Sequence, residues 1–261
     1  MHTNDRHHLK SFWKEGNLVG TKKGFHMFQK QDFNHIHSDK DFKSIFSELS
    51  SDELLHLTSV MRSVEVKKGE SVFMEGSYPK GLYYVNKGKI KVTQIGIDGK
   101  EQIVHLAKNN DVMGYRAILS SDRYSCSAIA MENSSLYYIP KDVFFSLIEK
   151  NSKFALQVFH LFSKELKEAE KKITTIAQRP VKERIAQSIL QLIDCFGFEK
   201  DNCTMAVVIT REEIANISGS SRETVIRVLT ELEENKILGL SGKKIRILLP
   251  EALRKAANQF D

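Results

Sequence analysis

The sequence contains few cysteines and no long apolar run, and both absences exclude broad classes of protein. Three scattered cysteines, Cys126, Cys195 and Cys203, are too few for the disulfide framework of a small secreted domain. No apolar run approaches the roughly 20 residues that a membrane-spanning helix needs. The polar N-terminus also lacks the apolar core of a secretory signal. We therefore expect a reduced, cytoplasmic protein without a membrane segment.

Motifs of the common enzyme classes are also missing. The chain has no P-loop, no GxSxG and no HExxH, and its carboxylates are spread over segments that look like solvated helix faces. The net charge is only +6, and from residue 204 onward nine Lys and Arg face eight Asp and Glu. Bulk charge therefore does not identify a partner, and we expect a protein that is not an enzyme. With 261 residues, of which 41% are hydrophobic, the chain can form two domains with buried cores.

Residues 209–233 are the segment around which the chain is organised. Thr210, followed three residues later by Glu213, forms a capping box at the start of a short helix, and Gly219 is placed to end that helix. Ser220 and Glu223 have the same spacing and predict the start of a second helix. Its apolar residues recur at the spacing of a buried helical stripe. These are Val225, Val228, Leu229 and Leu232.

Two helices joined by a tight turn are typical of a helix-turn-helix, whose second helix enters the major groove of DNA. Arginine matches the acceptors of guanine, and glutamate accepts a hydrogen bond from cytosine. Ser221, Arg222, Thr224 and Arg227 lie off the buried stripe, on the exposed side of the first turns of the second helix. Ser221 and Thr224 are expected to bond phosphate, and Thr210 is a further expected DNA-binding residue. The alternative is a plain helical hairpin with a solvated charged face.

A predicted β-hairpin follows directly and favours the DNA-binding interpretation. Residues 237–249 form two short β-rich runs around Ser241 and Gly242, and Lys243, Lys244 and Arg246 add charges that could contact phosphate. A hairpin beside a helix-turn-helix is the wing of a winged helix. Residues 209–215 (ITREEIA) and 219–229 (GSSRETVIRVL) together resemble the C-terminal domain of the Crp/Fnr family of bacterial transcription regulators.

Residues 63–139 contain seven short runs rich in β-branched and aromatic residues, separated by glycines, and they predict a sandwich or jelly roll. Within them, residues 68–77 (KGESVFMEGS) and 81–92 (GLYYVNKGKIKV) resemble the cyclic-nucleotide-binding β-roll. The resemblance to the Crp/Fnr family thus covers roughly residues 41–252. We expect four segments: a leader (1–40), a β-roll with flanking helices (41–140), a dimerisation helix (141–179) and a DNA-binding domain (180–261).

A single long helix is expected over about 140–178, before Pro180 breaks it. Its apolar residues are spaced alternately by four and three, which is the heptad pattern of a coiled coil. They are Ala155, Phe159, Phe162, Leu166, Ala169, Ile173 and Ile176. One interpretation is a helix that lies on its own β domain. The strict period favours a partner helix, and the resemblance implies a homodimer through this helix.

The resemblance would imply cyclic AMP, but the residues that hold it in the family are replaced. The family has a glutamate for the ribose and an arginine for the cyclic phosphate, where this chain has Tyr115 and Cys126. A phosphate without its guanidinium loses a charge-assisted bidentate pair. We therefore expect no cyclic AMP binding of the family kind. The candidate pocket residues are Gly114, Tyr115, Arg116, Arg123, Cys126 and Ser127.

Other effectors stay open. The leader holds six of the nine histidines, which with Met27 are candidate ligands for haem or a metal. They are His2, His7, His8, His26, His35 and His37. A flexible leader is the alternative. An iron–sulfur cluster is not expected, since the first 125 residues contain no cysteine.

We expect an α+β fold with an antiparallel β-roll or jelly roll, a long coiled-coil dimerisation helix and a C-terminal winged helix-turn-helix. The resemblance implies a homodimeric regulator whose Arg222, Glu223 and Arg227 read an inverted repeat of TGTGA-like half-sites in double-stranded DNA. We expect RNA polymerase as a further partner. We expect no cofactor. The alternative is a haem, metal or redox sensor whose β-roll binds another effector.

Overall fold

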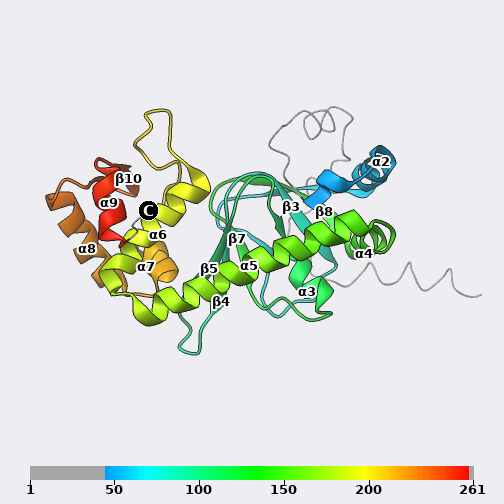
Figure 1. Cartoon of the computed structure of the whole chain (residues 1–261), viewed down its shortest axis with the longest axis horizontal. Coiled ribbons are helices and arrows are strands. Elements are labelled where there is room, and N and C mark those ends of the chain that lie inside the picture. Colours follow the sequence, from blue (N-terminus) through cyan, green and yellow to red (C-terminus); the bar gives the residue numbers. More distant parts are fainter. Residues whose placement is uncertain (1–44, 259–261) are drawn as a thin grey trace, which may run out of the picture.

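The computed structural model describes residues 45–258. The expected leader lies outside this range, as do its histidines. Figure 1 shows a β-rich N-terminal part, a long helix that runs along it, and a smaller, mostly helical C-terminal part. The mixed architecture with antiparallel sheets, a long helix and a C-terminal helix-turn-helix confirms the predicted fold class. Among the described residues, no helix is both long and apolar enough to cross a membrane.

Two four-stranded antiparallel sheets build the N-terminal part, which we call the β-roll. The first has the order β1-β8-β3-β6 and the second β2-β7-β4-β5. The strands are β1 (Arg62–Val66), β2 (Ser71–Phe73), β3 (Gly81–Lys87), β4 (Ile90–Ile95), β5 (Glu101–Ala107), β6 (Val112–Met113), β7 (Ser127–Ala130) and β8 (Ser134–Pro140). Seven of them lie where the sequence predicts strands. The short β6, with only two residues, was not predicted.

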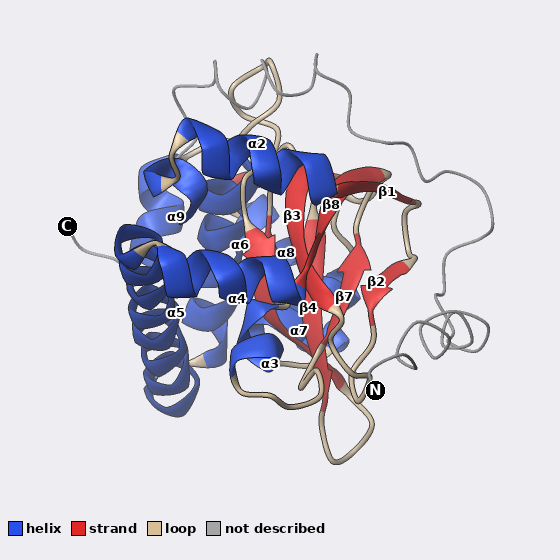
Figure 2. Ribbon diagram, turned by 90° about the vertical axis from the view of Figure 1, so that its right-hand side faces the viewer, coloured by secondary structure: helices blue, strands red, loops and turns tan. Residues whose placement is uncertain are grey.

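Inward-facing side chains of both sheets form the core of the roll. Val85, Ile90 and Leu136 have no exposed surface, and burial of each such side chain stabilises the fold by roughly 1.5–3 kcal/mol. Helices cover one side of the sheets (Figure 2). They are the 3₁₀ helix η1 (Ile45–Glu48), α2 (Ser51–Val60), α3 (Tyr115–Leu119), α4 (Lys141–Lys150) and α5 (Ser152–Gln178).

The single helix expected over about 140–178 is two helices, α4 and α5, and this prediction was wrong at Asn151. Asn151 has extended backbone angles and ends α4. Its Oδ1 accepts a hydrogen bond of 3.0 Å from the backbone N–H of Phe154 and so caps α5. An asparagine favours such a cap over a helix interior because its side chain competes for backbone hydrogen bonds. The heptad pattern begins after this break, in α5.

The C-terminal part consists of α6 (Val181–Phe196), α7 (Arg211–Ser218), α8 (Arg222–Glu234), the hairpin of β9 (Leu238–Ser241) and β10 (Lys244–Ile247), and α9 (Pro250–Ala256). These elements pack around one core, in which Ile189, Ile214 and Leu229 are fully buried. Ile103 and Leu106, from β5 of the roll, belong to the same core. The two parts of the chain are therefore packed together and are not merely joined by a linker.

Candidate nucleic-acid interface

The first helix of the predicted helix-turn-helix, α7, has the expected cap. The backbone N–H of Glu213 donates to Thr210 Oγ1 at 3.1 Å, and the backbone N–H of Thr210 donates to Glu213 Oε2 at 2.9 Å. Gly219 ends the helix at φ 62° and ψ 47°, in the left-handed region that favours glycine. These contacts confirm the predicted capping box and turn.

The second helix, α8, begins one residue later than predicted. Its cap is Ser221, whose Oγ accepts a hydrogen bond of 3.2 Å from the backbone N–H of Thr224. Ser220 is part of the turn, because its backbone N–H donates to the Ala215 carbonyl at 3.1 Å. The predicted capping box between Ser220 and Glu223 was therefore wrong. Glu223 is left with its carboxylate on the exposed side of the helix.

The exposed side of α8 carries the predicted base contacts. Arg222, Glu223 and Arg227 are exposed, whereas the predicted apolar stripe from Val225 to Leu232 is buried. Hydrogen bonds from the N–H of Glu223 itself and from Ser221 lower the pKa of the Glu223 carboxyl, and Arg222 adds to this effect. Glu223 therefore presents a charged acceptor near the Arg222 guanidinium group.

The β9–β10 hairpin forms the predicted wing and brings Lys243 toward the start of α7. An open hollow of about 560 Å³ lies between these elements, lined by Thr210, Arg211, Glu212, Arg222, Ile226, Gly242 and Lys243. Lys244 does not line this hollow, because its Nζ is paired with Glu199 Oε1 at 2.9 Å. The structure thus separates two lysines that are neighbours in sequence.

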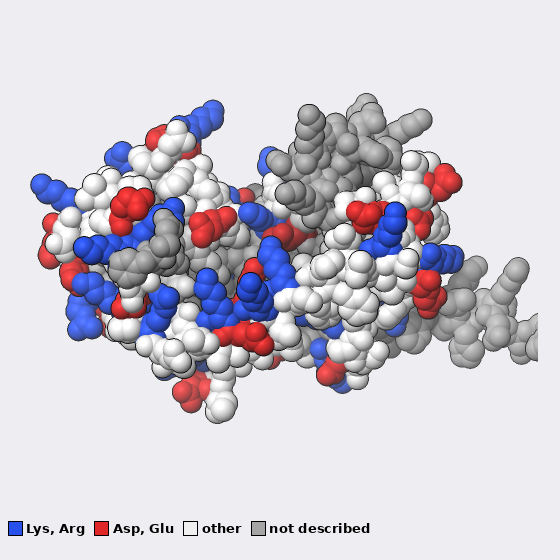
Figure 3. Space-filling view, viewed as in Figure 1, with Lys and Arg blue, Asp and Glu red and all other residues white. Residues whose placement is uncertain are grey.

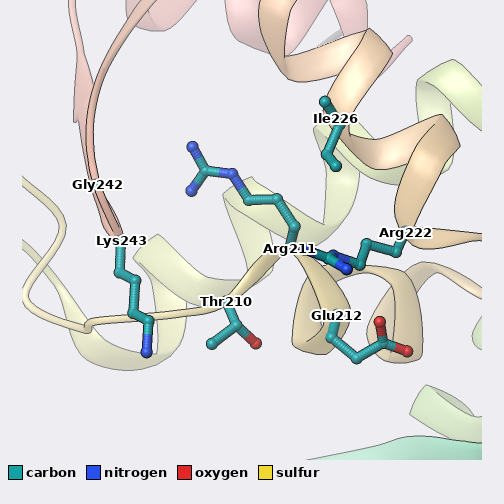
Figure 4. Close-up of a pocket in the computed structure, with 7 residues that line it drawn as sticks. All are labelled: Thr210, Arg211, Glu212, Arg222, Ile226, Gly242 and Lys243. Carbon is teal, nitrogen blue, oxygen red and sulfur yellow. The ribbon is translucent and has the colours of Figure 1, made fainter.

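Arg211 is a candidate contact that the sequence reasoning missed. Figure 4 shows its side chain extending into the hollow between α8 and the wing. Its Nη1 is buried and has no hydrogen-bond partner within residues 45–258. A buried, unpaired guanidinium nitrogen is costly and suits an anionic partner. Its position directly after the cap Thr210, at the exposed start of a helix, was the available signal.

Two residues of the candidate effector pocket, Tyr115 and Arg116, contact the long helix α5. Tyr115 is 2% exposed and packs edge-on against Phe162 of α5, with ring centres 5.2 Å apart. Burial raises the pKa of Tyr115 above its usual value, and the nearby carboxylate of Glu165 adds to this shift. Arg116, next to Tyr115, lies with its Nε 3.6 Å from Glu165 Oε2. Gly114 precedes them at φ 86°.

The other candidate pocket residues, Arg123, Cys126 and Ser127, make contacts within the β-roll. Arg123 donates from Nη1 to the Gly76 carbonyl at 2.8 Å and lies 4.1 Å from the ring centre of Tyr78. Cys126 is buried in the core of the roll, and burial raises the pKa of its thiol. Ser127 Oγ accepts a hydrogen bond of 2.9 Å from the backbone N–H of Glu75.

The leader histidines and Met27, as candidate haem or metal ligands, lie outside the described residues. Within the described part of the chain, no group of three or more His, Cys, Asp or Glu side chains is placed to hold a metal ion.

The apolar seam of α5 lies largely at the surface. Phe159, Leu166 and Ile173 are 67%, 62% and 68% exposed, and Ile176 is 41% exposed. Ala169 is exposed, and Ala155 and Phe162 are half-buried. In Figure 3, uncharged surface covers the region over α4 and the first half of α5, and Lys and Arg gather toward the C-terminal part.

A second contact region joins the roll to the helix-turn-helix. The side-chain amide of Gln102 on β5 donates to the carbonyl of Asn216 on α7. Lys91 on β4 lies between two carboxylates, with Nζ 2.9 Å from Glu101 Oε1 and 3.5 Å from Glu213 Oε1. Lys172 of α5 donates to the Ile103 carbonyl on β5 at 2.6 Å. β5 is thus held by both α7 and α5.

Two family models match the two parts of the chain. A cyclic nucleotide-binding domain matches residues 63–151, and a Crp-like helix-turn-helix domain matches residues 183–256. Among solved structures, FixK2 from Bradyrhizobium japonicum has a TM-score of 0.67 at 23% identity, over 76% of this chain and 97% of that one. A Crp/Fnr-family regulator from Thermus thermophilus has a TM-score of 0.64 at 22% identity, over 75% and 98%. These structures share the fold.

Characterised relatives are closer in sequence. The fumarate and nitrate reduction regulatory protein of Yersinia pestis is 32% identical over 80% of this chain and 84% of its own length. The protein of the same name from Vibrio cholerae is 30% identical, over 77% and 80%. A CRP-like cAMP-activated global transcriptional regulator from Mycobacterium tuberculosis is 26% identical, over 82% and 96%. The relatives are transcription regulators and not enzymes, and this chain belongs to the Crp/Fnr family of transcription regulators.

Proposed function

We propose that the protein binds an inverted repeat in DNA as a homodimer formed along α5, and that cyclic AMP does not control this binding. The exposed seam of α5 is the observation that carries the proposal. Phe159, Leu166 and Ile173 recur on one side of a 27-residue helix and are more than 60% exposed in the single chain. A second α5, packed against this seam in the manner of a coiled coil, would remove these side chains from water.

A two-fold axis along paired α5 helices would place two copies of α8 on one face of the dimer. Helix-turn-helix dimers bind half-sites about one turn of DNA apart, so the operator has the symmetry of the protein. Arg222, Glu223 and Arg227 lie on the exposed side of each α8 and would contact base edges. Arginine pairs with guanine and glutamate with cytosine, which fits TGTGA-like half-sites. Arg211 and Lys243 would contact phosphate at the rim of the groove.

The degenerate pocket supports the absence of control by cyclic AMP. Cys126, which stands at the position of the phosphate-binding arginine in the family, is buried and carries no charge at neutral pH. Arg123 is engaged with Gly76 and Tyr78, and Arg116 interacts with both Glu165 and the Cys126 thiol. Calorimetry with cyclic AMP should therefore show no micromolar binding. Binding of that strength would reject this part of the proposal. A haem or metal effector remains an alternative, and contact with RNA polymerase remains a prediction.

The experiment for DNA binding is fluorescence anisotropy on the full chain, freed of metal and haem. The probes are a TGTGA-type inverted repeat, the same duplex with one half-site scrambled, and a fully scrambled duplex. We expect tight binding to the full repeat, a loss of at least tenfold with one half-site, and weak, strongly salt-dependent binding to the scrambled duplex. Equal affinity for the first two probes would argue against the dimer. Equal affinity for all three would argue against the half-site, and selection from random DNA would then determine it.

A further inference from the structure

An exposed isoleucine lies on α8 among the residues proposed to contact DNA. Ile226 is 44% exposed, whereas its neighbour Val225 is fully buried. A single exposed apolar side chain is ordinary on a protein surface. Its surroundings make this one unusual, because Ile226 lines the hollow together with Arg211, Arg222 and Lys243. Figure 4 shows Ile226 on α8 facing the Arg211 side chain.

The spacing on α8 places Ile226 with the base contacts. Arg222 and Ile226 are four residues apart, so they lie one above the other on the same side of the helix. Arg227 directly follows Ile226 in the sequence, and Glu223 lies one helical turn before Arg227. If these three charged side chains reach base edges, Ile226 lies between them in the major groove and not outside it.

The charge around Ile226 and the chemistry of the major groove together indicate which group its aliphatic side chain would contact. Three of the residues that line the hollow with Ile226 are cationic (Arg211, Arg222 and Lys243) and one, Glu212, is anionic. This excess of positive charge favours an anionic polymer over the apolar face of another protein. In the major groove, the one methyl group on a base edge is the 5-methyl of thymine. Cytosine has only a C5–H at this place, and the polar groove-facing atoms are hydrogen-bond donors or acceptors. If the isoleucine lay opposite a hydrogen-bond donor or acceptor of a base, that group would be removed from water without gaining a partner. Affinity would then be lower.

We propose that Ile226 is a specificity-determining residue that packs against the 5-methyl group of one thymine in each half-site. This inference rests on the proposed function, since it requires α8 to lie in the major groove. It adds a position of the half-site that the charged residues do not determine. It also predicts that the protein discriminates thymine from uracil, which has the same hydrogen-bonding groups and lacks the methyl.

The test begins with selection of the preferred half-site from random DNA, using the full chain. Each thymine of the selected repeat is then replaced by uracil, one symmetric pair at a time, and binding is measured for the wild type and for Ile226→Ala. For the wild type we expect one pair whose replacement weakens binding about fourfold per half-site, or about fifteenfold for the repeat, from the loss of one methyl contact. For Ile226→Ala we expect weaker binding to the thymine duplex and no difference between thymine and uracil at that pair.

Two controls separate this effect from changes in folding. Ile97→Ala makes the same substitution at a fully exposed position in the turn between β4 and β5, and it should leave the thymine preference unchanged. Ile226→Val keeps part of the aliphatic contact and should restore part of the discrimination.

Different outcomes overturn the proposed function and the proposed role of Ile226. A selection that yields no enriched motif overturns the proposed function and this inference with it. An enriched motif with no uracil-sensitive thymine, or one whose sensitivity is the same in Ile226→Ala, overturns this inference and leaves the proposed function intact.

Discussion

The side-chain amide of Gln102, in the β-roll, donates a hydrogen bond to the backbone carbonyl of Asn216, in the first helix of the helix-turn-helix. The last carbonyls of a helix have no partner within the helix. At the end of α7, side chains of other elements donate to these carbonyls. Besides Gln102, Arg184 of α6 donates from Nε to the Ser218 carbonyl and from Nη2 to the Gly219 carbonyl, each at 3.0 Å. The turn of the helix-turn-helix is thus held by the β-roll and by α6.

Replacement of Gln102 should loosen this contact. In Gln102→Ala, the end of α7 loses a hydrogen bond worth roughly 0.5–1.5 kcal/mol, so amide exchange in α7 should become about two- to tenfold faster. Hydrogen exchange followed by mass spectrometry measures this change. Gln94→Ala, at an exposed position on β4, is the matched control and should leave α7 unchanged. Equal exchange in the wild type and in Gln102→Ala would mean that this contact does not hold the helix.

A charge on the seam of α5 should dissociate the proposed dimer. In Leu166→Lys, each protomer loses an apolar contact of roughly 1.5–3 kcal/mol. The symmetric interface loses it twice, so the dimer dissociation constant should rise at least about 100-fold. Sedimentation velocity over a concentration series measures this shift. Leu55→Lys makes the same change at a position on α2 that is 55% exposed and should have no effect. A dimer of unchanged stability in Leu166→Lys would place the interface elsewhere.

Arg211 and Arg222 should affect DNA binding in different ways. Arg211→Ala removes a phosphate contact, so affinity should fall for every sequence and the salt dependence should decrease by about one unit per protomer. Arg222→Ala should cost about 1–3 kcal/mol per half-site and relax the preference at one base pair. Binding titrations at several salt concentrations distinguish the two effects. Arg254→Ala, on α9, is the control. Full affinity and selectivity in Arg222→Ala would show that Arg222 does not contact a base.

Lys172 should make stability depend on pH in the alkaline range. Burial lowers the pKa of Lys172 from 10.5 to about 8. The unfolded chain therefore binds this proton more tightly than the folded protein does. Stability should consequently rise as the pH increases from about 8 to about 10.5, and the buried charge should cost free energy below that range.

Urea denaturation at about pH 7 and about pH 9.5 tests this expectation. Lys172→Met should be more stable than the wild type at the lower pH, and the difference should shrink at the higher pH. Lys171→Met changes the exposed neighbouring residue and should leave the pH dependence as it is in the wild type. A Lys172→Met variant that is less stable at both pH values would show that the bond to the Ile103 carbonyl outweighs the cost of the charge.

Local patterns in the sequence were sufficient for most of the secondary structure. The capping box at Thr210, the glycine turn at Gly219 and the buried stripe of α8 depend on residues within a few positions of one another, so a single stretch of sequence determines them. Prediction failed where two local solutions compete. Ser220 and Ser221 can each cap α8, and the turn uses the first. Similarly, Asn151 interrupts a segment that is otherwise compatible with one helix.

The sequence by itself determined the family, the two parts of the chain and the residues on the exposed side of α8, because these follow from motifs and short periodicities. Only the tertiary structure decided which charges are free. It pairs Lys244 with Glu199 and directs Arg123 to Gly76. Among residues 45–258 it leaves Arg211 Nη1 without a hydrogen-bond partner, in the hollow beside Ile226. These contacts join residues up to about 50 positions apart. Such pairings depend on how the strands and helices pack, and no local pattern encodes them.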